Sequence, residues 1–197
     1  MQPDIHRLLE LQKVLAVFNT IERVVHREHH GTYVAENDTE HSYNLAMTAW
    51  YLSSWFPELD KNKLIQYSLA HDLVEIHAGD TYIYGSSEEL NSKKQREADA
   101  LVKLKKEWSD FGDMLNAIEA YEAKASPEAK FVYALDKIMP MMQIYINDGY
   151  SWKKHNVTLK MTQDYKTPKI SLSPELLHYY NQLNALLLEH PELIKKA

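Results

Sequence analysis

Residues 69–80 read Leu-Ala-His-Asp-Leu-Val-Glu-Ile-His-Ala-Gly-Asp. On a helix, His71 and Asp72 would project about 100 degrees apart, and Glu75, four residues after the histidine, would face the same side. Asp80 lies just beyond the expected end of this helix. These polar residues stand in an apolar stretch, where a charged group is costly unless it is paired or binds a metal. A helix with ordinary surface charges is the alternative interpretation.

Two further polar residues interrupt apolar helix faces. His41 shares a stripe with the apolar residues of 45–52, so its side chain should point inward, although a single inward histidine is more often a core residue than a ligand. Asp136 interrupts the apolar run 132–139, and a buried carboxylate needs a cation or several donors. Pro140 cannot donate a helical hydrogen bond to the carbonyl of Asp136, which predicts a kink there.

Together these residues predict a metal site. The expected ligands are two histidines and two carboxylates: His41, His71, Asp72 and Asp136. Nitrogen and oxygen ligands of this kind suit Co, Mn, Mg, Zn, Fe or Ni rather than a soft metal. Four protein ligands leave room for water and substrate only on a five- or six-coordinate ion, so we expect one catalytic divalent ion rather than a closed tetrahedral zinc.

The composition favours helices throughout the chain. Glycine is scarce, with five in 197 residues, and alternation of Val, Ile and Thr is rare. The fold class that we expect is all-α: a single compact helical domain over residues 1–197, with the motifs in a core of about 23–140 and accessory C-terminal helices in 151–190. The expected helices are Asp4–Val25, Asn37 to just before Pro57, Asp60–Ala78, Glu88–Trp108, Asp110–Lys124, Ser126–Asn147, Ser151–Thr162 and Pro174–Glu189.

The charge and the absence of certain residues exclude several classes of protein. A formal net charge of -6 is unsuited to binding a nucleic acid polymer, which needs a basic surface. The chain has no cysteine, so disulfides, thiolate metal sites and a cysteine nucleophile are excluded. Neither a signal peptide nor a membrane-spanning stretch is visible, which makes a cytoplasmic protein without membrane contact the default expectation.

The amino-acid sequence around the four candidate ligands resembles the motifs of a known family. The order His41, His71-Asp72, Asp136 resembles the H…HD…D signature of the HD-domain metal-dependent phosphohydrolases. Three longer matches resemble the branch that contains bacterial 5'-deoxynucleotidases and their eukaryotic relatives, and the matched motifs span residues 23 to 137. These matches are Glu36–Ser42, Ala70–Glu75 with Gly79-Asp80, and Ser126–Phe131 leading to Asp136-Lys137.

The resemblance implies an HD-domain helical bundle, one divalent metal ion, a homodimer, and hydrolysis of nucleoside 5'-monophosphates to nucleoside and phosphate. It also implies that Arg23, near the end of the first helix, binds the substrate phosphate; a cation placed at a helix C-terminus is the alternative role. Val24 stands where the deoxynucleotidases have an aromatic residue that helps to choose the sugar. The resemblance therefore does not extend to selection of deoxyribose.

In the expected mechanism, Glu75 and Asp80 divide two tasks: activating the attacking water and protonating the departing 5'-oxygen. We favour Glu75 as the acid because it is the more buried of the two on the expected helix. Tyr82 and Tyr84 in the following loop either stack on a base or cover the site.

There are three alternatives to a 5'-nucleotidase, and the first of them stays open. An HD-type phosphodiesterase or triphosphohydrolase would use the same site on another nucleotide. A non-catalytic regulatory domain with a structural metal is disfavoured by the two spare carboxylates, Glu75 and Asp80. A di-iron bundle needs paired Glu-x-x-His motifs, which the sequence lacks in the required places.

Overall fold

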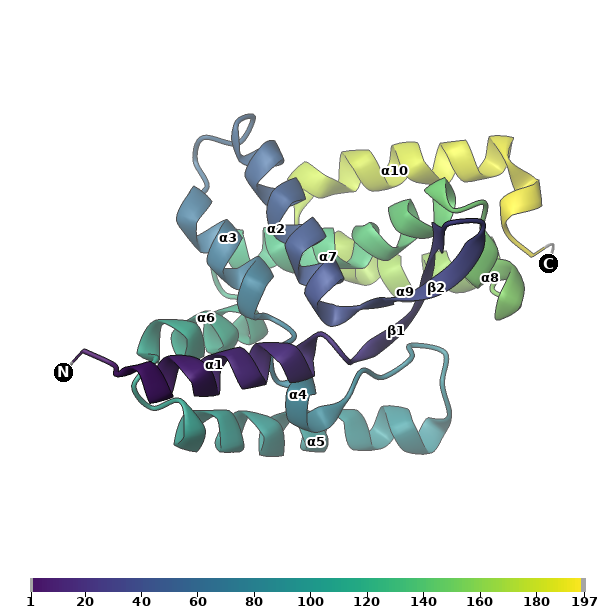
Figure 1. Ribbon diagram of the computed structural model, residues 1–197. Coiled ribbons are helices and arrows are strands. Elements are labelled where there is room, and N and C mark those ends of the chain that lie inside the picture. Colours follow the sequence, from purple (N-terminus) through teal and green to yellow (C-terminus); the bar gives the residue numbers. More distant parts are fainter. Residues whose placement is uncertain (1, 196–197) are drawn as a thin grey trace.

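Helices form most of the chain, as expected for the all-α class (Figure 1). The structure is a computed structural model that describes residues 2–195. A small antiparallel sheet of two strands accompanies the helices. The elements are α1 (Ile5–Phe18), β1 (Glu22–His29), β2 (Thr32–Asn37), α2 (Asp38–Ser53), α3 (Lys61–Ala70), α4 (Glu75–Ala78), α5 (Ser87–Glu107), α6 (Gly112–Ala123), α7 (Pro127–Ile146), α8 (Tyr150–Lys154), α9 (Leu159–Ile170), α10 (Pro174–Glu189) and the short 3₁₀ helix η1 (Pro191–Leu193).

Helix α7 is the central element of the fold. Its start is the one predicted: the side chain of Ser126 accepts a hydrogen bond from the backbone N–H of Ala129, and Pro127 occupies the first turn. The helix then runs through Pro140 to Ile146 and packs against α2, α3 and α6 as well as α9, α10 and β1. Because neighbours surround it, a polar side chain in the middle of α7 is buried.

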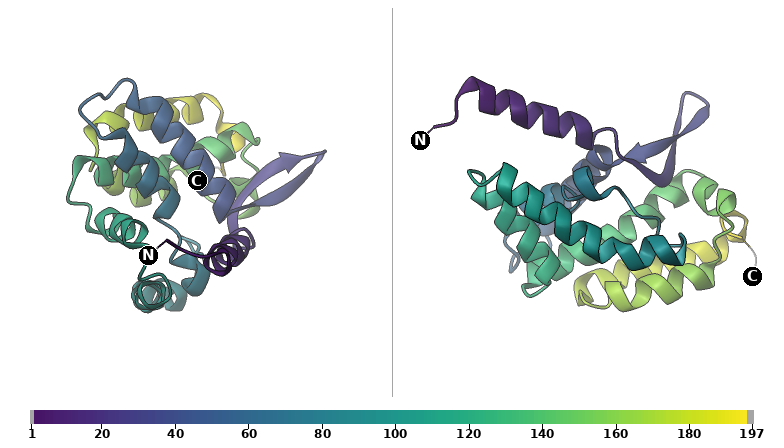
Figure 2. Two further views of the ribbon diagram at one scale, coloured as in Figure 1. Left: turned by 60° about the vertical axis from the view of Figure 1, so that its left-hand side comes forward. Right: turned by 90° about the horizontal axis from the view of Figure 1, so that it is seen from below.

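The N-terminal prediction was wrong beyond Phe18. The expected helix Asp4–Val25 ends there, and Glu22–His29 instead forms β1, which pairs with β2 (Figure 1). At the tip of this hairpin, His30 and Gly31 both have positive φ, 51° and 80°, as a two-residue type I′ turn requires. The two strands project from the helical body (Figure 2). Arg23 therefore lies on a strand, and a helix C-terminal role for it is ruled out.

The start of α2 was predicted correctly. Asn37 accepts a hydrogen bond from the backbone of Glu40, whose side chain accepts one from the backbone of Asn37, which completes a capping box. These two reciprocal hydrogen bonds fix the first turn of α2 at the end of β2. His41 follows directly and is fully buried.

The expected helix Asp60–Ala78 is interrupted. Helix α3 ends at Ala70, and residues 71–74 form turns with bonds of the 3₁₀ type, from Leu73 N–H to Ala70 C=O and from Glu75 N–H to Asp72 C=O. The one-turn helix α4 follows, and Gly79, with φ of 72°, ends it. The interruption changes the directions of His71 and Asp72 from those of a straight helix.

The C-terminal third differs from the prediction in one place. The expected helix Ser151–Thr162 is divided into α8 and α9, whereas α10 has the predicted bounds. Buried side chains of α9 and α10, such as Ile170 and Tyr180, belong to the same hydrophobic cluster as the apolar face of α7. Among the residues described, we find no helix with both the length and the apolarity that crossing a bilayer requires.

Gly149, between α7 and α8, provides a test of this packing. It has φ of 68°, and a Cβ placed there would lie 1.9 Å from the backbone oxygen of Leu193. Gly31 also has positive φ but open space around it. We expect Gly31→Ala to cost about 1–2 kcal/mol of unfolding free energy through backbone strain alone, and Gly149→Ala to cost roughly 1–3 kcal/mol more through the added clash. Urea unfolding measures both, and equal costs would contradict the close approach.

Candidate metal centre

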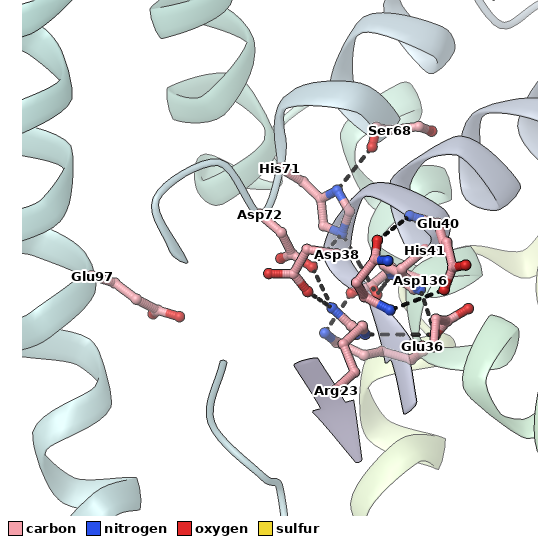
Figure 3. Close-up of polar contacts among 12 residues, drawn as sticks. Arg23, Glu36, Asp38, Glu40, His41, Ser68, His71, Asp72, Glu97 and Asp136 are labelled. Atoms are coloured by element: carbon pink, nitrogen blue, oxygen red, sulfur yellow. Dashed lines mark hydrogen bonds and ion pairs between the residues drawn. The ribbon is translucent and has the colours of Figure 1, made fainter. Parts of the chain in front are cut away.

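Four elements meet at one polar cluster, which Figure 3 shows in close-up. The ligand-type atoms of His41, His71 and Asp136 lie within 4.8 Å of one another. Asp72 belongs to a neighbouring group with Asp38 and Glu75, but its Oδ2 lies 3.0 Å from Nε2 of His71. The structure thus brings together the four ligands expected from the sequence, which come from α2 (His41), the turn after α3 (His71 and Asp72) and α7 (Asp136).

His71 presents one ring nitrogen to the cluster. Its Nδ1 lies 2.9 Å from the backbone oxygen of Ser68 and donates to it, which directs Nε2 toward Asp72 and Asp136. The buried Nε2 makes no hydrogen bond of its own. Burial lowers the pKa of His71, but the carboxylates of Asp72 and Asp136 raise it to about 10. The raised pKa means that Nε2 binds a proton readily. A metal cation at Nε2 would compete with this proton and would offset the charge of the two carboxylates in its place.

His41 is held between two carboxylates. Its Nε2 lies 3.0 Å from Oδ1 of Asp136, and its Nδ1 lies 3.7 Å from Oε2 of Glu36. Burial lowers the pKa of His41 to about 4, with the positive charge of Arg23 contributing. The ring is therefore neutral near pH 7, and a neutral imidazole is the form that binds metals.

Asp136 connects the two histidines from the middle of α7. Its Oδ1 faces both rings, while Oδ2 accepts hydrogen bonds from Tyr121 at 3.0 Å and from Lys137 at 2.5 Å. Burial raises the pKa of Asp136, but Lys137 and the histidines outweigh it and hold the pKa well below its usual range. The carboxylate is therefore ionised, and its Oδ1 faces the two histidine rings.

Arg23 reaches from β1 into the acidic side of the cluster. Its Nη1 lies 2.9 Å from Oδ1 of Asp38 and 2.8 Å from Oδ2 of Asp72, and its Nε lies 3.7 Å from Glu36. Glu75 and Asp80 also act on its charge. Five carboxyl groups thus lie around one guanidinium, and those that stay ionised, such as Asp72, favour a further cation in the cluster.

Glu75 and Asp80 lie beside this group. Glu75 is buried, its Oε2 has no hydrogen-bond partner, and burial together with Asp72 and Asp80 raises its pKa well above the usual value. Burial also raises the pKa of Asp80, partly offset by Arg23. Both carboxyl groups are thus close to the candidate metal ligands, and Glu75 is the one more strongly driven toward the protonated form.

The sequence did not single out Glu36, Asp38, Tyr121 and Lys137 as site residues. Glu36 and Asp38 stand within the matched motif before His41, and both are buried. The inward-facing position of Glu36 on β2 became visible only with the hairpin, which the sequence interpretation lacked. Tyr121 comes from α6, and nothing in its local sequence distinguishes it from a core aromatic residue.

The donor set fits a divalent cation of hard or borderline character. It combines two imidazole nitrogens with carboxylate oxygens, and one of those nitrogens, Nε2 of His71, is buried without a hydrogen bond. The partners behind the histidines, Ser68 C=O for His71 and Glu36 for His41, are of the kind that orient metal-binding rings.

Comparison with known proteins agrees with this geometry. Two relatives are similar over part of their length. The 5'-deoxynucleotidase HDDC2 of Danio rerio is 30% identical over 112 residues, covering 56% of this chain and 54% of that protein. The 5'-deoxynucleotidase hdd1 of Schizosaccharomyces pombe is 24% identical over 123 residues, covering 59% of this chain and 61% of that protein. The chain thus matches little more than half of the length of these relatives.

A solved structure matches along nearly the whole chain. The crystal structure of a predicted metal-dependent phosphohydrolase from Magnetospirillum magnetotacticum MS-1 is similar with a TM-score of 0.79 and 27% sequence identity, over 98% of this chain and 100% of that one. Residues 20–176 match the family described as HD domain. This match covers well over half of the chain and confirms the resemblance found in the sequence: the chain belongs to the HD domain family.

Proposed function

We propose that this protein is a metal-dependent phosphohydrolase that converts nucleoside 5'-monophosphates to nucleoside and phosphate. One observation carries the proposal: Asp72 contacts both the candidate metal site and Arg23. Its carboxylate lies beside His71 of the cluster that also contains His41 and Asp136, and it forms an ion pair with the guanidinium of Arg23. A candidate metal site thus lies directly beside a permanent cation. The printed names of the similar proteins, two 5'-deoxynucleotidases and a metal-dependent phosphohydrolase, support the same chemistry.

The residues proposed to hold one divalent ion are His41, His71, Asp72 and Asp136. Such an ion would polarise a phosphate oxygen and supply a nucleophilic water near neutral pH. Its identity among Co, Mn, Mg, Zn, Fe and Ni is left open by this ligand set.

Arg23 is proposed to bind the phosphate of the substrate. A guanidinium offers two parallel donors that match two phosphate oxygens, and it stays charged at any working pH. Of its two present partners, Asp38 and Asp72, the second is the carboxylate that a phosphate dianion can replace. Asp38 then keeps Arg23 in position, because this carboxylate is completely buried.

The two remaining carboxyl groups are proposed to move the protons. One water molecule adds to phosphorus, the bond from phosphorus to the 5'-oxygen breaks, and the leaving oxygen needs one proton. Glu75 suits the donor role because burial and its acidic neighbours favour its protonated form. Asp80, at the edge of the cavity beside Arg23, then orients and deprotonates the water.

The location and assembly expected from the sequence stay predictions. The resemblance implies a homodimer, and α2 carries exposed large apolar residues on its outer side that a partner copy would cover: Tyr43, Met47, Trp50 and Tyr51. A cytoplasmic location is the default drawn from the sequence alone.

The first test measures phosphate release from a panel of nucleoside 5'-monophosphates by chelator-treated protein reloaded with each metal in turn. We expect release that requires a metal and falls by at least about 100-fold in Asp72→Asn, because this change removes a proposed ligand and a partner of Arg23. Asp164→Asn, at an exposed position on α9, is the matched control and should keep full activity. Full activity in Asp72→Asn would refute the ligand assignment.

A second test concerns Glu36, which faces both His41 and Arg23. Glu36→Gln keeps the size of the side chain but removes the carboxyl group behind the histidine ring. Burial raises the pKa of this carboxyl group to about 7. We expect roughly 10- to 100-fold weaker metal binding, the usual effect of losing an outer partner of a metal-binding histidine. Competition with a chromophoric chelator measures this affinity. Glu28→Gln on the exposed part of β1 is the control, and unchanged affinity in Glu36→Gln would show that Glu36 does not support the ligand.

A third test separates the roles of Glu75 and Asp80. If Glu75 protonates the leaving oxygen, Glu75→Gln should slow hydrolysis of a nucleotide far more than hydrolysis of p-nitrophenyl phosphate, whose leaving group needs no proton. Asp80→Asn should slow both substrates alike, by roughly 100-fold or more, since activation of water is common to both. Single-turnover rates give the comparison, and the reverse pattern would exchange the two assignments.

A further inference from the structure

A cavity extends from the metal centre toward the C-terminal helices. Its wall near the centre includes Arg23, Asp80 and Asp136. Its far wall is formed by α8, α9 and the loop after Gly79, with the residues Tyr82, Tyr84, Trp152, His155, Tyr165 and Lys166. The volume of this half-open cavity is about 110 Å³, somewhat less than the ~150 Å³ of a protein cavity that accommodates benzene. The space therefore suits a compact group attached to a larger substrate.

Lys166 is the unusual residue of this wall. Only 5% of it is exposed, and lysine is almost never buried to this degree without a paired anion. Within residues 2–195, its ammonium makes no ion pair, and its hydrogen bond goes to the backbone oxygen of Lys137 at 2.6 Å. The one carboxylate that attracts it, Asp136, is already paired with Lys137.

The charges around Lys166 are mostly positive. Burial, together with the positive charges of Lys137, Lys169 and Arg23, lowers the pKa of Lys166 to about 7. A buried cation among cations is costly unless an anion approaches it. The cavity is the side from which such an anion can come, because Lys137, Lys166 and Arg23 all line it.

Two polar atoms of the same wall also have no hydrogen-bond partner. The hydroxyl of Tyr84 and Nε2 of His155 are both buried and unbonded. The tyrosine hydroxyl can donate a hydrogen bond, and so can one nitrogen of a neutral imidazole. Together with the ammonium of Lys166, the wall thus offers several donors, a combination that an oxyanion satisfies.

We propose that this cavity binds a second anionic group of the substrate, so that the preferred substrate carries two phosphate groups. One phosphate would lie at Arg23 and the four candidate metal ligands, and the other at Lys166, Tyr84 and His155. This inference rests on the proposed phosphohydrolase function and changes its preferred substrate from nucleoside 5'-monophosphates to nucleotides that carry two phosphate groups.

The experiment compares adenosine 5'-monophosphate with adenosine 3',5'-bisphosphate and adenosine diphosphate on metal-loaded protein. The wild-type protein should prefer at least one of the two-phosphate compounds in kcat/KM. Lys166→Met should reduce this preference by roughly 10- to 100-fold, the effect of losing a charge-assisted hydrogen bond. Tyr84→Phe removes only one hydroxyl and should destabilise the fold far less. It should also reduce the preference for the two-phosphate compound. Lys160→Met is the control, because Lys160 lies on the same helix, is exposed and stands outside the cavity wall.

A second readout does not depend on turnover. The preferred two-phosphate compound should raise the Tm of the wild-type protein more than the monophosphate does, and Lys166→Met should abolish the difference. Equal preference in the wild-type protein by both readouts would overturn the inference and leave the phosphohydrolase proposal standing, with the cavity holding water only. A Tm difference that depends on Lys166, without phosphate release from any compound, would support the anion site and refute the catalytic proposal.

Discussion

The burial of one ionised carboxylate, that of Asp136, is the constraint on which the rest of the structure depends. Its Oδ1 lies 3.0 Å from His41 and 3.8 Å from His71, while Tyr121 and Lys137 bond the other oxygen. A charge in this position is tolerated only when such partners surround it. Each partner requires a specific backbone feature. The capping box at Asn37 places His41, the turn after Ala70 turns His71 inward, and α7 must lie centrally so that helices on both sides can reach it.

The same constraint explains why the centre is poised for a cation. Arg23 is shared among five carboxyl groups, and the nearby charges of Asp72 and Asp136 raise the pKa of His71. These are stabilising charges that a bound divalent ion would partly replace, so metal binding, proton release and folding stability are thermodynamically linked in this protein. A bound divalent ion would change the contacts of Arg23 most. Relieved of part of its carboxylate contacts, the guanidinium can offer its fork to an incoming phosphate without leaving Asp38.

The sequence predicted those parts of the molecule whose signals are local. His41 and Asp136 were found because each interrupts an apolar helical face, and Asn37 and Ser126 because capping depends on residues three positions apart. The β-hairpin was missed because strands gain their stability from pairing with a distant segment, and Arg23-Val24-Val25 continues an apolar pattern that also fits a helix. The turn at His71 was missed for a related reason. Propensity favours an unbroken helix over residues 60–78, and tertiary contacts of the two polar residues override it.

Residues such as Glu36, Tyr121 and Lys166 show where local reasoning ends. Their chemistry arises from burial, and their burial arises from elements that meet only in the folded chain. This difference divides the molecule into two parts with different roles. The residues around the candidate metal lie between positions 23 and 136, where the motif is readable. The far wall of the cavity is built largely by α8 and α9, outside the core of 23–140 marked by the motifs. These C-terminal helices were expected to be accessory, yet they supply a buried lysine, Lys166, that forms no ion pair within the described residues. In the proposed arrangement the motif residues would supply the chemistry, and the C-terminal helices with the loop that faces them would select the substrate.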